Sequence, residues 1–243
     1  MRIKSVLLVA AMAGALLLSG CAATHTAITK RNLDVQTKMS ETVFLDPRPA
    51  SEKVVYLQIR NTSDEQGITI EPKIRQAVES RGYTVTNDLD QAYYLLQTNI
   101  LQVGETDLRG AQTALAQGYG AGLTGAVVGG AAFGGGSGRV GTALVGGLVG
   151  MAANAMVKDV HFTMITDLQI SERAAQGVVI SENNRAALKQ GTSGHRTVTS
   201  HETTDWHRYQ TRIVSTANQV NLTFDKALPE LEQGLSQSIA GLL

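Results

Sequence analysis

The stretch "VHFTMITDLQI" (residues 160–170) alternates apolar and polar side chains and predicts one long β-strand. The residues of one face are apolar: Phe162, Met164, Leu168 and Ile170. The residues of the other face are polar: His161, Thr163, Asp167 and Gln169. A strand that is apolar on one face packs that face against a core. The stretch therefore predicts a domain built on a half-buried sheet.

Sequence on either side of this strand predicts further strands and helices. Residues 55–60 alternate in the same way, and residues 83–86 and 93–103 also have strand character. A helix is expected after residues 61–64, with Pro72 in its first turn and Gly82 just past its end. Together these segments predict an α+β fold, a soluble domain of mixed sheet and helices.

The C-terminal part predicts a hairpin followed by an amphipathic helix. Residues 197–224 are rich in Thr and Val, with a turn expected at 214–218. The apolar residues of the last segment then recur at steps of three and four. They are Phe224, Leu228, Leu231, Leu235, Ile239 and Leu242. Such a stripe is buried either in the core of the chain or in an oligomer seam, and both readings stay open.

Residues 110–157 differ in composition from the rest of the chain. Of the 25 glycines, 15 lie between 110 and 150, and Arg139 is the only charged residue of the segment. Two apolar runs, 114–133 and 140–157, each approach the length that crosses a bilayer as a helix. A glycine-rich turn separates them. The segment therefore predicts an inserted apolar helical hairpin that enters a membrane, with Ser137 and Arg139 at its tip.

Glycine spacing supports close packing of these two helices. Four glycine pairs have the GxxxG spacing, which lets helix backbones touch within lipid. The pairs are Gly118/Gly122, Gly125/Gly129, Gly130/Gly134 and Gly146/Gly150. The alternative is a disordered or buried glycine-rich loop, since glycine lowers helix propensity in water by about 1 kcal/mol relative to alanine.

The first twenty residues have the order of a bacterial secretory signal. Arg2 and Lys4 precede an apolar run over residues 6–18. The single cysteine of the chain, Cys21, follows Gly20, an arrangement that resembles the lipobox of bacterial lipoproteins. The resemblance implies cleavage between Gly20 and Cys21, and a diacylglycerol and an acyl chain on the new terminus. The alternative is an ordinary signal with an incidental cysteine.

The lipobox also predicts location and anchoring. Residue 22 is Ala rather than the Asp that retains lipoproteins in the inner membrane, so the outer membrane is expected. Acyl chains on Cys21 are sufficient for stable anchoring, because each buried methylene contributes about 0.8 kcal/mol. This covalent lipid is the only non-protein group expected.

Charge gives no support to a nucleic-acid partner. Loss of residues 1–20 leaves 19 Lys plus Arg against 21 Asp plus Glu, whereas a nucleic-acid interface is basic. The predicted organisation has five parts. They are the signal peptide (1–20), a lipidated linker (21–41), the first part of the α+β domain (42–109), the glycine-rich hairpin (110–157) and the second part of the domain with the C-terminal helix (158–243).

Catalytic and metal motifs are not recognisable in the sequence. His201 and His207 are six residues apart in a strand-like segment, and zinc-protease helices place two histidines four apart. Ser137 lacks the second glycine of a nucleophile elbow, because residue 139 is Arg. Trp206 is either a contact residue or a packed aromatic. The sequence therefore predicts no enzyme and no metal site.

Several long strings resemble one family of bacterial lipoproteins. They are "AITKRNLDVQTKMSETVFLDP" (27–47), "LQIRNTSD" (57–64), "GLVGMAANAMVKDVHFTMITDLQISER" (147–173), "ALKQGTSG" (187–194) and "YQTRIVSTANQVNLTF" (209–224). In this order they resemble the TraT family, the surface exclusion and complement resistance lipoproteins of conjugative plasmids. The similarity runs from the lipobox to the C-terminus, although it is weakest at the first apolar run and its glycine-rich tip.

The resemblance implies a surface-exposed outer-membrane lipoprotein that forms a large, ring-like homo-oligomer. Its expected partners are outer-membrane lipid, other copies of itself, the mating apparatus or pilus of a donor cell, and complement components. The implied function is to block conjugative mating-pair formation and to protect against complement. The alternative is an envelope-structural or export-pore lipoprotein of the outer membrane without exclusion activity.

Overall fold

The computed structural model describes residues 28–123, 157–174, 178, 180–190 and 194–243. Strands dominate this part of the chain, and the two longest have 15 residues each. In chain order the elements are β1 (Asp34–Met39), η1 (Ala50–Glu52), β2 (Val54–Asn61), α2 (Glu71–Glu79), β3 (Thr84–Thr86), β4 (Tyr94–Glu105), α3 (Leu108–Gln117), β5 (Asp159–Arg173), β6 (Ile180–Gln190), β7 (Gly194–Thr204), β8 (Trp206–Val220) and α6 (Phe224–Ala240).

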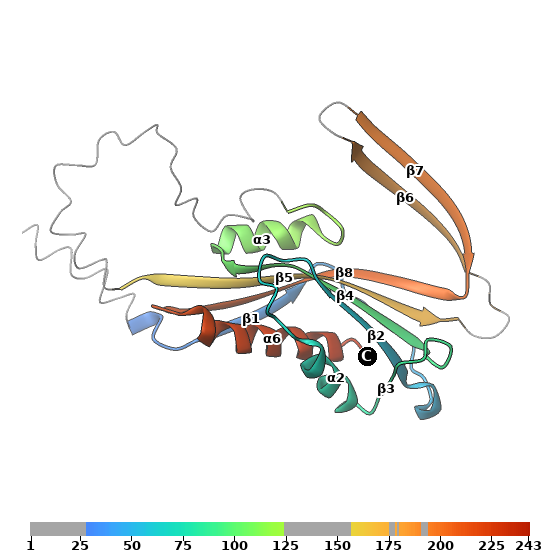
Figure 1. Cartoon of the computed structure of the whole chain (residues 1–243), viewed down its shortest axis with the longest axis horizontal. Helices are drawn as coiled ribbons and strands as arrows, with labels where there is room; N and C mark the ends of the chain where they lie inside the picture. Colours follow the sequence, from blue (N-terminus) through green and yellow to red (C-terminus); the bar gives the residue numbers. More distant parts are fainter. Residues whose placement is uncertain (1–27, 124–156, 175–177, 179, 191–193) are drawn as a thin grey trace, which may run out of the picture.

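Six strands form one curled sheet in the order β1-β8-β5-β4-β2-β3 (Figure 1). The pairs β1–β8, β8–β5 and β5–β4 are antiparallel, whereas β2 is parallel to both β4 and β3. The parallel pairs require a crossover between strands, and α2 is the helix in the β2 to β3 crossover. The alternating stretch at 160–170 forms the middle of β5, so the predicted strand is confirmed.

The predicted fold class is wrong. The chain folds mainly as the curled sheet, with three α-helices in its described part, rather than as an α+β domain with an inserted apolar helical hairpin. None of the helices in the described ranges is long and apolar enough to cross a membrane. In the described part of the predicted hairpin, the small apolar residues Ala111 and Ala114 of α3 pack against the sheet.

The first predicted hairpin helix, over 114–133, is wrong at its start, because Gly118 ends the helix there. α3 ends at Gln117, because Gly118 and Gly120 have φ values of 71° and 72°. Such left-handed glycines terminate helices. Gly118 and Gly122 therefore do not lie on one helix. Eight residues named for the hairpin lie outside the described residues: Gly125, Gly129, Gly130, Gly134, Gly146, Gly150, Ser137 and Arg139.

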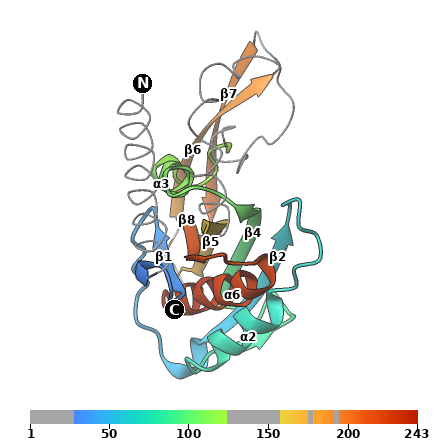
Figure 2. The same ribbon diagram turned by 90° about the vertical axis from the view of Figure 1, so that its left-hand side faces the viewer.

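One face of the sheet carries the main core. α6 packs on β8 and β1, and α2 packs beside α6 on the same side (Figures 1 and 2). The stripe predicted for the C-terminal helix is confirmed, since Leu231, Leu235 and Ile239 are buried in this core. From α2, Ile74 and Val78 join them. Burial of each such side chain is worth about 1.5–3 kcal/mol, so this layer holds the fold together.

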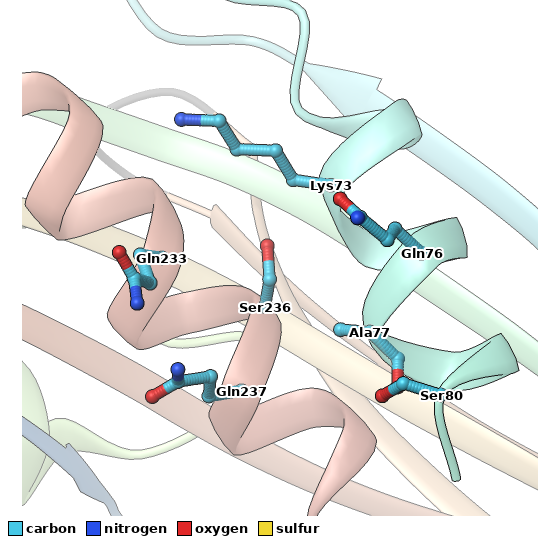
Figure 3. Close-up of a pocket in the computed structure, with 7 residues that line it drawn as sticks. All are labelled: Lys73, Gln76, Ala77, Ser80, Gln233, Ser236 and Gln237. Carbon is cyan, nitrogen blue, oxygen red and sulfur yellow. The ribbon is translucent and has the colours of Figure 1, made fainter.

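A hollow between α2 and α6 marks the seam between these helices (Figure 3). Its volume is about 370 Å³. It is lined by Lys73, Gln76, Ala77, Ser80, Gln233, Ser236 and Gln237. The Nζ of Lys73 lies 2.5 Å from Oε2 of Glu232, so an ion pair joins the two helices at this hollow.

The opposite face is covered in part by α3, which lies across β5 and β8 (Figure 1). Strand β4 has a β-bulge between Ile100 and Gln102. The extra residue sends Leu101 to the α3 side, while Ile100 and Val103 both belong to the α6 side. A small second cluster results, with buried Ala111, Ala114, Ile165 and Val214.

β6 and β7 form a separate two-stranded ribbon, the second sheet of the described part. It projects from the ends of β5 and β8 on the same side as α3 (Figures 1 and 2). The hairpin predicted over 197–224, with a turn at 214–218, is wrong. β8 runs through those residues as a continuous strand, because β5 pairs with its whole length from Trp206 to Val220.

Candidate functional site

The residues singled out in the sequence do not come together in the described part of the chain. Cys21 and Gly20 lie outside it, as do the hairpin residues from 125 onward. Gly118 and Gly122 are described, and both lie where the chain leaves α3 for the glycine-rich segment. We call residues 119–123 the root of that segment. The root leads to the site described below.

α3 delivers the chain to this root. Asp107 precedes the helix in extended conformation, and its Oδ1 accepts a hydrogen bond of 2.7 Å from the backbone N–H of Gly110. This is a helix N-cap, which typically contributes about 1 kcal/mol. At the other end, Gly118 has φ 71° and ψ −173°, a conformation that is essentially restricted to glycine. The Asp107 N-cap and Gly118 therefore fix where α3 begins and ends.

A buried ion pair holds the root on the sheet. The Arg212 side chain is fully buried, and its Nε and Nη2 donate to the two carboxylate oxygens of Asp167 over 2.7 and 3.0 Å. Nη2 also donates to the carbonyl of Ala121 over 2.8 Å, and Nη1 to that of Ala114 over 3.4 Å. Oδ2 of Asp167 accepts from the N–H of Gly120 over 2.8 Å. The pair thus ties α3 and the root to β5 and β8.

Tyr119 lies in the root beside this pair. Burial raises the pKa of its hydroxyl, and the negative charge of Asp167 raises it further. The residue is 38% exposed, so part of it lies on the protein surface. Tyr119 therefore stays neutral at physiological pH and offers an uncharged hydroxyl and an aromatic face.

The chain returns from the glycine-rich segment at Lys158, and this end is fixed as well. The Lys158 N–H donates to Oδ1 of Asn221 over 2.9 Å, and its carbonyl accepts from the Asn221 N–H over 2.8 Å. The Lys158 Nζ lies 2.7 Å from Oε1 of Glu105. Asn221 has φ 51°, a left-handed conformation that asparagine tolerates better than most residues.

Both ends of the segment are thus fixed at different points along one strand. The root is held at Asp167 in the middle of β5, and the return lies at the start of the same strand. Eight residues at about 3.3 Å per residue separate Asp159 from Asp167, or roughly 26 Å. The sheet therefore holds the glycine-rich segment by two separate attachments.

Beyond α3, the same face of the sheet carries a row of four glutamines, which we call the glutamine ladder. Its members occupy one register across β2, β4, β5 and β8. Each amide donates to the next over 2.7 Å: Gln210 to Gln169, Gln169 to Gln97, and Gln97 to Gln58. A flat row of neutral donors and acceptors offers hydrogen bonds to a macromolecular partner without charge selection.

Trp206 lies at the end of this face, where β8 begins. Arg173 is placed over its ring, with Cζ 5.0 Å from the ring centroid, a cation–π contact. The guanidinium of Arg173 also donates to the carbonyls of Leu89 and Asp90. Trp206 is therefore packed by Arg173 but remains half-buried, so part of its ring is accessible.

The polar groups on the α3 face of the sheet either hold the root in place or are available to bind a partner. Both carboxylate oxygens of Asp167 and three nitrogens of Arg212 are used in internal hydrogen bonds. Across the described ranges, no cluster of three or more His, Cys, Asp or Glu side chains is suited to a metal ion. The glutamine ladder and the accessible part of Trp206 form an interaction surface beside the doubly attached segment.

A family model described as the enterobacterial TraT complement resistance protein matches residues 32–243. The chain belongs to the TraT complement resistance family. A TraT complement resistance protein of Escherichia coli (strain K12) is 49% identical over 247 residues, covering 100% of both chains. The TraT complement resistance protein of Wigglesworthia glossinidia brevipalpis is 30% identical over 234 residues, covering 92% of this chain and 90% of the relative.

Sequence reasoning missed the central pair of this TraT-family site. Asp167 was assigned to the polar face of its strand, but its partner on β8 was not identified. Arg212 lies between Thr211 and Ile213, both buried. A lone arginine within the run "TRIVSTA" was the available signal, because a charge is almost never fully buried unless it is paired. The four glutamines of the ladder lie within segments that the sequence predicts as strands. Only the order and register of those strands in the sheet bring them side by side.

Proposed function

We propose that this chain is a lipid-anchored outer-membrane protein whose copies form a homo-oligomeric surface assembly. The assembly protects the cell against complement and blocks the formation of mating pairs with conjugative donors. The family match over residues 32–243 supports the protection against complement, because the family is named for complement resistance. The whole-length likeness to the E. coli relatives supports it.

The N-terminus supplies the attachment to the membrane in this proposal. Acyl chains on Cys21 insert in the outer membrane, and the chain from 22 to the start of β1 is the tether. Stable anchoring needs more than one acyl chain, and the lipobox provides three. The folded part then stands at the surface of the membrane.

The mechanism in this proposal is steric and adhesive contact with a partner. The α3 side of the sheet carries mainly side chains that can bind a partner, rather than side chains that can react. The glutamine ladder and the half-buried Trp206 present neutral hydrogen bonds and an aromatic ring. Repetition of this face in an oligomer multiplies weak contacts, because linked sites bind with high effective concentration. A complement component or a donor surface held in this way cannot complete its own assembly.

Two assays on the same strains test the proposal. Cells with and without the protein are exposed to serum, and are also mated with several conjugative donors. Higher serum survival together with lower recipient ability supports both activities. Survival without exclusion restricts the function to complement resistance. No change in either assay overturns the proposal and favours an envelope-structural or export role.

The Cys21→Ser variant separates anchoring from folding. Without the thiol no diacylglycerol is attached, so the variant should leave the outer-membrane fraction and lose serum protection. A variant that still fractionates fully with the outer membrane shows that the lipid is not what holds the protein there.

A further inference from the structure

β1 forms one edge of the six-stranded sheet, and its outward side is unpaired in the described part of the chain. The N–H of Ser40 donates to the carbonyl of Arg212 over 2.8 Å, so position 40 faces β8. In an antiparallel pair, successive residues alternate between facing the partner and facing away. Val35, Thr37 and Met39 therefore present their N–H and C=O groups to the open edge. Three residues of open ladder can accept another strand.

Open space borders this edge on both faces of the sheet. On the α6 side, a hollow of about 410 Å³ is lined by Val35, Thr37 and the α6 residues Glu230, Gln233, Gly234, Gln237 and Ser238. On the α3 side, a smaller hollow is lined by Gln36, Lys38, Leu108, Ala111, Gln112, Leu115, Val214 and Thr216. Successive side chains of a strand point to opposite faces. A strand added to β1 would therefore fill the two hollows alternately.

The α3-side hollow has an apolar wall that is only partly covered. Leu108 is 52% exposed at the start of α3, whereas Ala111 is buried beneath it. The α6-side hollow is more polar, and Gly234 keeps it open at a place where α6 comes close to β1. A Cβ added to Gly234 would lie 2.5 Å from Oγ1 of Thr37. The two sides thus favour a strand with one apolar and one polar face.

We propose that the β6–β7 ribbon of a second copy pairs with the free edge of β1 and joins neighbouring copies in the assembly. The inference rests on the oligomer of the proposed function, and it names the surfaces that build it. Main-chain hydrogen bonds along Val35, Thr37 and Met39 supply affinity, and the two hollows take alternate side chains of the added strand.

Strand lengths single out the ribbon as the occupant. Within the described ranges, the other open edge of the six-stranded sheet is β3, which has three residues. The two ribbon strands have 11 residues each, and in the described part of the chain neither pairs with any strand besides the other. Isolated two-stranded ribbons are marginally stable in water. In the described part of the chain, the ribbon and β1 each have an unpaired edge, so pairing between them would supply the missing backbone hydrogen bonds of both.

The geometry makes this contact head-to-tail. A copy that accepts a ribbon at β1 still presents its own ribbon, because the two lie at different parts of the chain. Such a heterologous contact repeats from copy to copy and closes into a ring when the rotation closes. The same pairing removes an exposed edge strand from every copy in a closed ring.

Proline at position 37 tests the edge directly. Thr37→Pro removes one outward N–H, whereas the N–H groups that bond to β8 stay in place. Thr37→Val is the matched control, because both variants lose the 3.0 Å bond between Thr37 Oγ1 and Ser215 Oγ. We expect the full-length proline variant in mild detergent to need about tenfold more protein for assembly, with the valine variant close to wild type. Thermal melting of both variants checks the fold.

Crosslinking identifies the occupant. Copies with Gln36→Cys are mixed with copies with Ala186→Cys in β6 or Thr199→Cys in β7, and a short bismaleimide is added. We expect crosslinked dimers in the mixture and none in either variant alone. Crosslinks in Gln36→Cys alone would show pairing of β1 with β1 and overturn the proposal.

The outcomes separate this inference from the proposed function. A wild-type protein that is monomeric and gives no serum protection overturns the proposed function. An oligomer that stays intact in Thr37→Pro, with its melting unchanged, overturns the edge contact alone. Loss of assembly in Thr37→Pro without any crosslink to the ribbon overturns the ribbon as occupant.

Discussion

The two faces of the sheet are built on different principles. On the α6 face, a large apolar cluster from β2, β4, β5, β8, α2 and α6 fills the layer. On the α3 face, the apolar cluster is small. Directional contacts stabilise this face instead: the Arg212 and Asp167 ion pair and the hydrogen bonds of the glutamine ladder. Apolar burial tolerates exchange of similar volumes, whereas a paired charge does not tolerate loss of its partner. The α3 face therefore depends on individual residues.

The largest effect is expected on the α6 face, from Leu231→Asp. Leu231 is fully buried in the core between α6 and the sheet. The change removes apolar burial and introduces an unpaired carboxylate, so a loss of more than about 5 kcal/mol in the free energy of unfolding is expected. Denaturant unfolding measures it. Leu231→Met is the control and should lose less than about 1.5 kcal/mol. A soluble, fully folded aspartate variant would contradict the comparison.

On the α3 face, Arg212→Met should come next. It leaves Asp167 buried without its cation and removes the donors to Ala114 and Ala121, so a loss of about 3–5 kcal/mol is expected. The double variant Arg212→Met with Asp167→Leu should regain much of this stability, because no unpaired charge remains. Denaturation of both proteins checks the cycle. Equal stability of the single and double variants would show that the pair does not hold the root.

Gly118 and Gly122 test the end of α3. Their GxxxG spacing predicts that they pack on one helix, whereas in the structure both lie beyond the end of α3. Gly118→Ala forces a side chain into a conformation restricted to glycine and should lose about 1–3 kcal/mol. Gly122→Ala has nothing within 4 Å of its new Cβ and no positive φ, so little change is expected. Thermal unfolding compares the two. Similar losses in both would favour close packing at both glycines over a helix stop at Gly118.

The smallest effect is expected in the glutamine ladder. Gln97 takes part in two of its bonds and Gln58 in one. Each net hydrogen bond is worth about 0.5–1.5 kcal/mol, so Gln97→Leu should lose about twice as much as Gln58→Leu. Neither should unfold the protein. A ladder that binds a partner would reduce serum protection in the Gln97 variant even where its melting is almost unchanged.

Periodicity predicted the α6 face well, because its residues are apolar at regular steps. The strands around Val55 and Phe162 and the stripe through Leu231 were all expected from spacing. Each depends only on neighbours in the sequence, so local pattern is sufficient. Those predictions hold although the fold class built from them was wrong.

The α3 face was not predictable in this way. The bulge at Leu101 shifts the alternation of β4, and no local pattern marks it. Arg212 and Asp167 are 45 residues apart and meet only through the pairing of β5 with β8. Glycine spacing suggested helix packing at Gly118 and Gly122, but the positive φ of Gly118 depends on how α3 ends. Long-range pairing decided the first two of these points, and backbone conformation decided the third.

The two attachments of the glycine-rich segment have a consequence for the length of that segment. Asp167 holds one end, and Asn221 and Glu105 hold the other at Lys158, independently of the residues between them. For a closed loop, doubling the length costs only about 0.6 kcal/mol of entropy. Because both attachments lie outside the segment, the sheet can hold a longer or shorter chain between them at little cost in free energy.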